Sequence, residues 1–178
     1  MQFRKAENSD LQEVVRIYDL THDAEEQGET TTGWIRKIYP TELTARAALA
    51  RGDLFVETDD NETICGTAII NQLQGDAYKK APWRFTAEDS EVMVLHTLAI
   101  SPERKGSGFG TAFLKFYESL ALSAGCRYLR IDTNARNTVA RAFYRKTGYR
   151  EIAVVPVDFN GIPGVDLVLL EKRINKHE

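Results

Sequence analysis

Three glycines alternate in the stretch "KGSGFG", directly ahead of a strongly helical segment. Glycine loses more backbone entropy on folding than any other residue, so Gly106, Gly108 and Gly110 at a helix entrance need a cause. Free N–H groups point out of the first turn of a helix, and the helix dipole adds partial positive charge there. The pattern therefore predicts a pyrophosphate site on bare main chain, with Arg104 and Lys105 as cations at its rim.

Two common phosphate motifs fit this loop poorly. A P-loop needs its lysine after the last glycine, whereas the order here is "KGS". The dinucleotide fingerprint G-x-G-x-x-G fits at Gly106 and Gly108 but has Thr111 at its sixth position. The preceding strand also ends at Ile100, too far from Gly106 for the tight turn of a dinucleotide site. Neither motif explains the loop.

A second constellation lies on the helix expected in "NARNTVARAFYRKTG". Asn137, Ala140 and Tyr144 stand at i, i+3 and i+7, so two polar side chains flank a small residue on one stripe. Such a stripe predicts a shallow track for a ligand, although spacing alone leaves open a solvent-facing stripe with a tyrosine at the core edge. The apolar side of this helix, expected to pack on the sheet, comprises Val139, Ala142 and Phe143.

Together the two stretches resemble the cofactor motifs of the GNAT superfamily of acetyl-CoA-dependent N-acetyltransferases, in its bacterial branch. "LAISPERKGSGFGTAFL" is similar to the pyrophosphate loop Gln/Arg-x-x-Gly-x-Gly/Ala, except that Lys105 stands at the Gln/Arg position. Lysine keeps the positive charge but lacks the planar donor fork of arginine. "NTVARAFYRKTGY" is similar to the second motif, N-x-x-A-x-x-x-Y-x-x-x-G-F/Y, and the likeness extends over essentially the whole chain.

This resemblance implies a fold and a set of binding residues. The fold would be a single α/β domain over residues 1–178, with a mixed, mostly antiparallel sheet of about seven strands flanked by about four helices. The sheet would splay between its fourth and fifth strands and admit the pantetheine arm of acetyl-CoA. The implied cofactor-binding residues are Leu98, Ala99, Ile100, Lys105, Gly106, Ser107, Gly108, Phe109, Gly110, Thr111, Asn137 and Tyr144.

The implied reaction is direct attack by a primary amine of a small molecule or peptide on the acetyl group of bound acetyl-CoA. Tyr144 would protonate the departing thiolate, and a backbone N–H near Leu98 to Ile100 would stabilise the oxyanion. His96 is the candidate general base, because histidine titrates near the operating pH. Asp132, Glu91, His22 or a water chain stay open as alternatives for the base, and no metal is expected. A non-catalytic coenzyme A-binding sensor is the alternative function.

Composition limits the remaining partners and the location. A net charge of -3 and a pI near 5.7 argue against nucleic acid or an anionic membrane as partner. The sequence has no apolar run of the roughly 20 residues that a membrane span needs. The N-terminal segment also lacks a signal peptide, so a cytoplasmic location is expected, with Cys65 and Cys126 as reduced, buried thiols. A homodimer is possible by resemblance.

Hydrophobic periodicity predicts the elements in the order β-α-α-β-β-β-α-β-α-β-β, which is an α/β domain with a mixed sheet. Two irregular segments, 22–40 and 72–89, interrupt this pattern and are expected to select the acceptor. The first holds an acidic group, which fits either a cationic acceptor or a solvated helix end: Asp23, Glu25, Glu26 and Glu29. Aromatic residues in both segments could line the acceptor site or cover the core edge: Trp34, Tyr39, Tyr78, Trp83 and Phe85.

Overall fold

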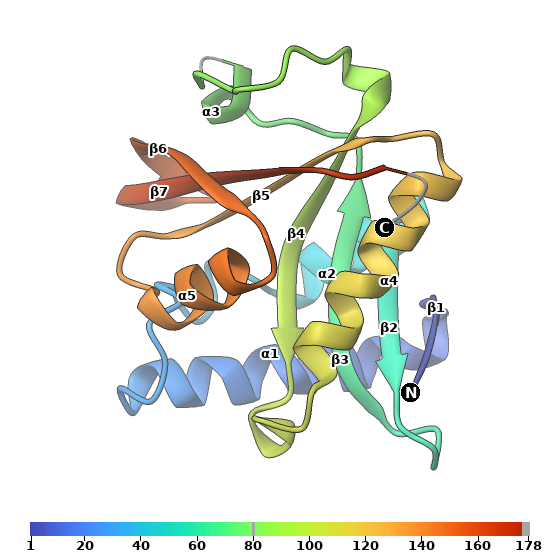
Figure 1. The fold of residues 1–178 in the computed structure, drawn as a ribbon. Coiled ribbons are helices and arrows are strands. Elements are labelled where there is room, and N and C mark those ends of the chain that lie inside the picture. Colours follow the sequence, from blue (N-terminus) through green and yellow to red (C-terminus); the bar gives the residue numbers. More distant parts are fainter. Residues whose placement is uncertain (80, 176–178) are drawn as a thin grey trace.

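The computed structural model describes residues 1–79 and 81–175. Within them, seven strands form one mixed sheet in the order β1-β2-β3-β4-β5-β7-β6 (Figure 1). The strands are β1 Gln2–Lys5, β2 Leu54–Thr58, β3 Ile64–Asn71, β4 Val92–Ile100, β5 Tyr128–Asn134, β6 Arg150–Phe159 and β7 Ile162–Arg173. The helices are α1 Leu11–Glu26, α2 Glu42–Arg51, α3 Asp76–Lys79, α4 Phe109–Ser123 and α5 Thr138–Lys146, with 3-10 turns η1 Asn8–Asp10, η2 Asp89–Glu91 and η3 Pro102–Arg104. The predicted fold class is confirmed.

The sheet is covered on both faces (Figure 1). Helices α1 and α2 lie on one face, where Val14 and Ile17 are fully buried. Helices α4 and α5 lie on the other, where Phe113 and Tyr117 are fully buried. Because apolar side chains fill both layers, the sheet is a rigid support for the segments at its edge.

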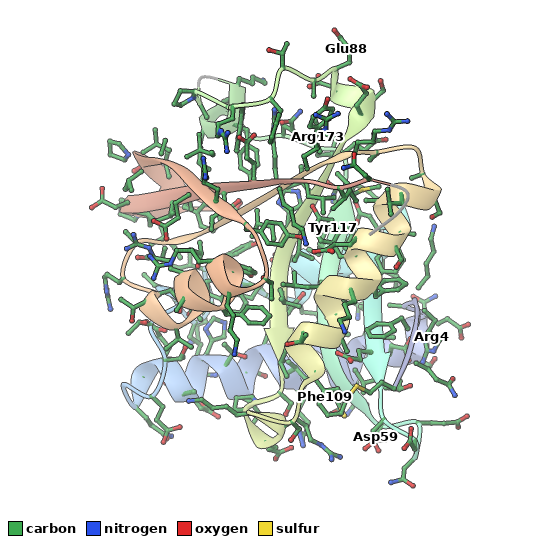
Figure 2. All side chains as sticks on the ribbon, viewed as in Figure 1. Arg4, Asp59, Glu88, Phe109, Tyr117 and Arg173 are labelled. Carbon is green, nitrogen blue, oxygen red and sulfur yellow. The ribbon has the colours of Figure 1, made fainter. Side chains whose placement is uncertain are left out.

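Strands β4 and β5 are parallel neighbours over only part of their length. Their pairing runs from Val92 with Tyr128 to Leu95 with Ile131 and goes no further. The Tyr117 side chain, labelled in Figure 2, donates a hydrogen bond to the Met93 carbonyl at 2.6 Å, within the paired part. Beyond Leu95 the two strands separate, so the predicted splay lies between the fourth and fifth strands.

A β-bulge in β4 lies just beyond this point. Thr67 of β3 opposes Ala99 and Ile69 opposes His96, so Thr97 and Leu98 together face a single residue of β3. Thr97 has φ of 51°, in the left-handed region. The extra residue reverses the side-chain alternation and turns Leu98 toward the α4 face, as bulges beside functional sites often do.

The acidic segment has a structural role that the sequence pattern did not predict. Helix α1 continues through it to Glu26. Arg36 pairs with Glu26 at 2.8 Å and also with Asp23, and Glu25 accepts hydrogen bonds from the Thr32 hydroxyl and the Gly33 N–H. These carboxylates therefore tie residues 32–36 to α1, although Asp23 and Glu26 remain exposed.

The sequence also predicts two reduced, buried thiols and no segment long and apolar enough to span a membrane. Cys65 and Cys126 are both buried and unpaired. Among the described residues, no helix combines the length and the apolar character needed to cross a bilayer.

Candidate active site

The glycine loop and α5 form the two sides of one cleft of about 590 Å³, which we call the loop groove. Ten of the twelve predicted cofactor-binding residues line it: Leu98, Ile100, Lys105, Gly106, Gly108, Phe109, Gly110, Thr111, Asn137 and Tyr144. Residues 28–31, which sequence reasoning missed, close its far side. Segments distant in sequence thus meet around one concave surface.

The loop presents its main chain to this groove. Gly106 and Gly108 have φ of 81° and 86°, and a Cβ added to either would meet no atom within 4 Å. Gly108 caps α4, so the N–H groups of the first helical turn face outward, with Phe109 buried below them (Figure 2). An anion can approach these amides without meeting a side chain, which is the geometry that a pyrophosphate needs.

The two predicted rim cations differ in their surroundings. Arg104 forms an ion pair with Asp59 at 2.8 Å, so its charge is partly neutralised. Lys105 is exposed and forms no ion pair within residues 1–79 and 81–175. Lys105 is therefore the cation of the loop that remains available to a ligand.

Two predicted binding residues do not line the groove. The Ala99 side chain points to the α1 face, because the bulge turns Leu98 and Ile100 to the other face. Ser107 is exposed to solvent at the outer side of the loop. The Ala99 side chain therefore cannot reach the groove, and only its main chain could take part in binding.

The prediction that Val139, Ala142 and Phe143 form the packing face of α5 is wrong in part. Val139 is 71% exposed and Ala142 is exposed, whereas Phe143 and Ala140 pack against the core that contains Tyr144. Burying two aromatic rings removes more apolar surface from water than burying a valine and an alanine, so the helix turns that way. The stripe of Ala140 and Tyr144 therefore faces inward, along the groove.

Tyr144 stands where the groove reaches the splay of the sheet. Its ring is 6% exposed, and no other described residue hydrogen-bonds its hydroxyl. Burial, assisted by the nearby Asp132 charge, raises the pKa of Tyr144, so the hydroxyl stays protonated at neutral pH. Asn137 beside it caps α5 by accepting a hydrogen bond from the Ala140 N–H at 3.1 Å, which leaves its amide NH₂ free to donate.

A small cavity of about 90 Å³, which we call the passage, lies at the splay and adjoins both the loop groove and a second cleft. The passage shares Leu98, Asn137 and Tyr144 with the groove, and it shares Thr97 and Asp132 with the second cleft. The second cleft measures about 470 Å³ and lies between β4, α3 and the end of β6. Two separate ligands could therefore approach the passage from opposite ends.

His96 lies in the second cleft together with Asp132. Its Nε2 atom is 3.1 Å from Oδ1 of Asn71. Burial lowers the pKa of His96, opposed by the Asp132 charge, so the imidazole is neutral at neutral pH and can accept a proton. Burial raises the pKa of Asp132, which accepts a hydrogen bond from the Tyr78 hydroxyl at 2.7 Å.

The other two candidates for a base lie elsewhere. His22 is buried under residues 32–40, with Nε2 3.0 Å from the Pro40 carbonyl oxygen, and lines none of the three cavities. Glu91 precedes β4 at the far end from the bulge, and its carboxylate accepts from the Glu88 N–H. No group of three potential metal ligands gathers within the described part of the chain.

The sequence leaves open whether the aromatic residues of segments 22–40 and 72–89 line the acceptor site or cover the core edge, and the structure shows some of each. Trp34 and Tyr39 line the passage, and Tyr39 hydrogen-bonds the Thr97 hydroxyl. Tyr78 lines the second cleft. Trp83 and Phe85 instead cover the sheet: the Trp83 ring lies 4.1 Å from the Arg130 guanidinium, and Phe85 packs on Tyr128.

The chain is similar to known proteins in both its sequence and its fold. The sequence model of the acetyltransferase (GNAT) family matches residues 14–149. An uncharacterised N-acetyltransferase of Methanocaldococcus jannaschii is 35% identical over 78 residues, which are 43% of this chain and 49% of that protein. The chain therefore spans about half of that relative's length.

A second relative is an aminoglycoside N(6')-acetyltransferase type 1 of Stenotrophomonas maltophilia. It is 32% identical over 111 residues, which are 62% of this chain and 67% of that protein. Among solved structures, a GNAT-family acetyltransferase of Streptococcus agalactiae superposes with a TM-score of 0.80 at 20% identity, covering 98% of this chain and 96% of that one. At that identity the likeness is one of fold.

Proposed function

The chain belongs to the acetyltransferase (GNAT) family, and from this premise we propose that it transfers the acetyl group of acetyl-CoA to a primary amine of a small molecule or peptide. One observation carries the proposal. The bare glycine loop and the Tyr144 side chain open onto a single groove, and the passage at the splay adjoins both this groove and a separate cleft. A cofactor and an acceptor entering from opposite ends would meet beside Tyr144.

Acetyl-CoA would supply an activated acetyl thioester. The main-chain N–H groups between Lys105 and Thr111 would hold its diphosphate, with the Lys105 side chain as counter-charge. Asn137 would donate its amide N–H to the pantetheine arm. Backbone groups of β4 beyond Leu95, which have no partner strand on the β5 side, would pair with the same arm as a neighbouring strand would.

Three groups of the chain would serve the chemistry. The amine nitrogen bonds to the acetyl carbon as the carbon–sulfur bond breaks, so the nitrogen must lose a proton and the sulfur must gain one. His96 would accept the proton of the amine from the second cleft, because it is neutral and faces that side. Tyr144 would give its hydroxyl proton to the sulfur. A backbone N–H freed by the bulge at Thr97 and Leu98 would stabilise the oxyanion.

Thiol release from acetyl-CoA over a panel of amines tests this proposal. The panel should include diamines, an aminoglycoside, free amino acids and lysine-containing peptides, with acetyl-CoA alone as the blank. Release that depends on one class of amine supports the transferase. Coenzyme A binding without turnover on any amine would favour the sensor alternative, and absence of binding would reject both.

A further inference from the structure

Tyr78 belongs to none of the motifs that suggested the function, yet it contacts the proposed site. It lies on α3, in the long connection between β3 and β4, and its side chain is 3% exposed. Its hydroxyl donates a hydrogen bond to Oδ2 of Asp132 at 2.7 Å. A tyrosine that reaches across 54 residues to a carboxylate in a catalytic cleft calls for a reason beyond packing.

Tyr78 is also held through its main chain. Its carbonyl oxygen accepts a hydrogen bond from Nε1 of Trp83 at 2.7 Å, and the Trp83 ring stacks over the Arg130 guanidinium. Arg130 and Asp132 stand two residues apart on β5, so they point to the same face of the sheet. The connection is thus fixed to β5 at several points, one of which is the Asp132 carboxylate.

Asp132 and His96 occupy matching positions at the splay. The last pair of the parallel ladder joins Leu95 to Ile131, and the next residue on each strand is His96 or Asp132. Both side chains line the second cleft, and each charge favours the charged form of the other group. A fixed carboxylate therefore stands beside the proposed base.

We propose that Tyr78 is a positioning residue, which holds the Asp132 carboxylate ionised and aimed toward His96, so that Asp132 stabilises the imidazolium formed when His96 takes the proton of the amine. The inference rests on the proposed function, because it assigns His96 as the base. In catalytic triads, likewise, a buried carboxylate orients a histidine base and stabilises its imidazolium form. Tyr78 lines the second cleft, but its hydroxyl is bonded to Asp132, so its role would be to position that carboxylate.

The electrostatics give the direction of each effect. Burial raises the pKa of Asp132, and the hydrogen bond from Tyr78 opposes that rise. Burial lowers the pKa of His96, and the negative charge of Asp132 opposes that fall. Losing the Tyr78 hydroxyl would favour neutral Asp132 and so lower the pKa of His96 further. Other groups also face this pair. They are Asn71 on β3, the Leu73 main chain, the Arg51–Asp53 ion pair before β2, and the Tyr39 and Tyr144 hydroxyls.

Tyr78→Phe tests the inference, with Trp83→Phe as the matched control. Tyr78→Phe removes one hydroxyl, whereas Trp83→Phe removes a hydrogen bond from the same connection and leaves the contact with Asp132 intact. In Tyr78→Phe we expect kcat to fall about tenfold with little change in the KM of acetyl-CoA. The acid limb of the pH–rate profile should also move to lower pH. Trp83→Phe should leave that limb in place.

A second readout does not depend on turnover. NMR titration of the His96 imidazole in the full chain should show a lower pKa in Tyr78→Phe and in Asp132→Asn than in the parent protein. If both variants leave the His96 titration unchanged, the inference is wrong, whatever happens to the rate. A fall in rate with an unmoved pH profile would likewise reduce Tyr78 to a packing role. Failure of the parent protein to release thiol on any amine, with a shifted His96 titration in the variants, would reject the proposed function alone.

Discussion

Gly108 and Gly125 allow a matched test of the loop groove. They flank α4, Gly108 as its N-cap and Gly125 two residues beyond its last residue, Ser123. Their φ angles are 86° and 82°, and a Cβ at either would meet no atom within 4 Å. Replacement by valine therefore imposes a similar backbone strain at both positions, and its Cβ meets no neighbouring atom at either. Only Gly108 faces the groove.

The stability cost of the two variants should be similar. A side chain in the left-handed region costs roughly 1–2 kcal/mol, and more when it is β-branched. For a chain of this length each kcal/mol lowers the melting temperature by roughly 2–4 °C. Gly108→Val and Gly125→Val should therefore both melt several degrees below the parent protein, as thermal unfolding followed by circular dichroism will show.

Coenzyme A affinity should separate the two variants. A valine at position 108 would stand where the diphosphate meets the N–H groups of α4. Losing two charge-assisted hydrogen bonds, each worth about 1.5–3 kcal/mol, weakens binding at least about 100-fold. Calorimetric titration should show this loss in Gly108→Val and near-parent affinity in Gly125→Val. Equal affinities in the two folded variants would refute the role of the loop, and the Gly108→Ala and Gly125→Ala pair repeats the test with less strain.

Further predictions concern two residues of the site and one buried carboxyl outside it. Tyr144→Phe should lower kcat by roughly 10- to 1,000-fold with coenzyme A affinity unchanged, because it removes the proposed proton donor only; undiminished kcat would exclude that role. Asn137→Ala should lower the free energy of unfolding by about 1 kcal/mol through the lost cap and should also weaken coenzyme A binding. Asn137→Asp should keep the cap and lose only coenzyme A affinity. Urea unfolding and calorimetry will distinguish the two variants. Burial raises the pKa of Glu57 to about 8, above its value in the unfolded chain, so the parent protein should lose stability as the pH rises from about 4.5 to about 8. Glu57→Gln should lose less over that interval in urea unfolding, and parallel curves would contradict the assignment of a neutral, buried carboxyl.

The features that could be predicted from the sequence are those that local rules determine. The alternating glycines at a helix entrance predict bare main chain, and Gly106 and Gly108 do adopt positive φ values open to the groove. The stretch "NGIPG" predicts a hairpin near the end of the chain, and it joins β6 to β7 with Asn160 and Gly161 at positive φ. The conformation at such positions depends only on the backbone preferences of one or two residues, so it can be predicted from a single sequence.

Other features depend on partners that are distant in the chain. Val139 is apolar but exposed, because the rings of Phe143 and Tyr144 compete for the same buried space. The acidic residues near position 25 looked solvent-facing, yet Arg36 and the Gly33 N–H neutralise or bind them. No local pattern reveals which of several charged groups will pair after folding.

The bulge in β4 and the contact of Tyr78 with Asp132 also could not be predicted from local sequence patterns. Thr97 is not a residue type that favours positive φ, so nothing in "LHTLAI" marks the extra residue. Tyr78 stood among several aromatic residues of one long segment, and only the folded chain brings it to β5. Both features shape the second cleft, and no spacing pattern in the sequence predicts either of them.

The central claim is that the main chain from Lys105 to Thr111 holds the diphosphate of coenzyme A. Amide chemical shifts of the ¹⁵N-labelled protein, followed during titration with coenzyme A, test it most directly. The N–H signals of Gly106, Gly108 and Gly110 should move in a saturable way, while that of Gly125 at the other end of α4 should stay in place. Binding that leaves the three loop signals unmoved, or no binding by a folded protein, would contradict the account.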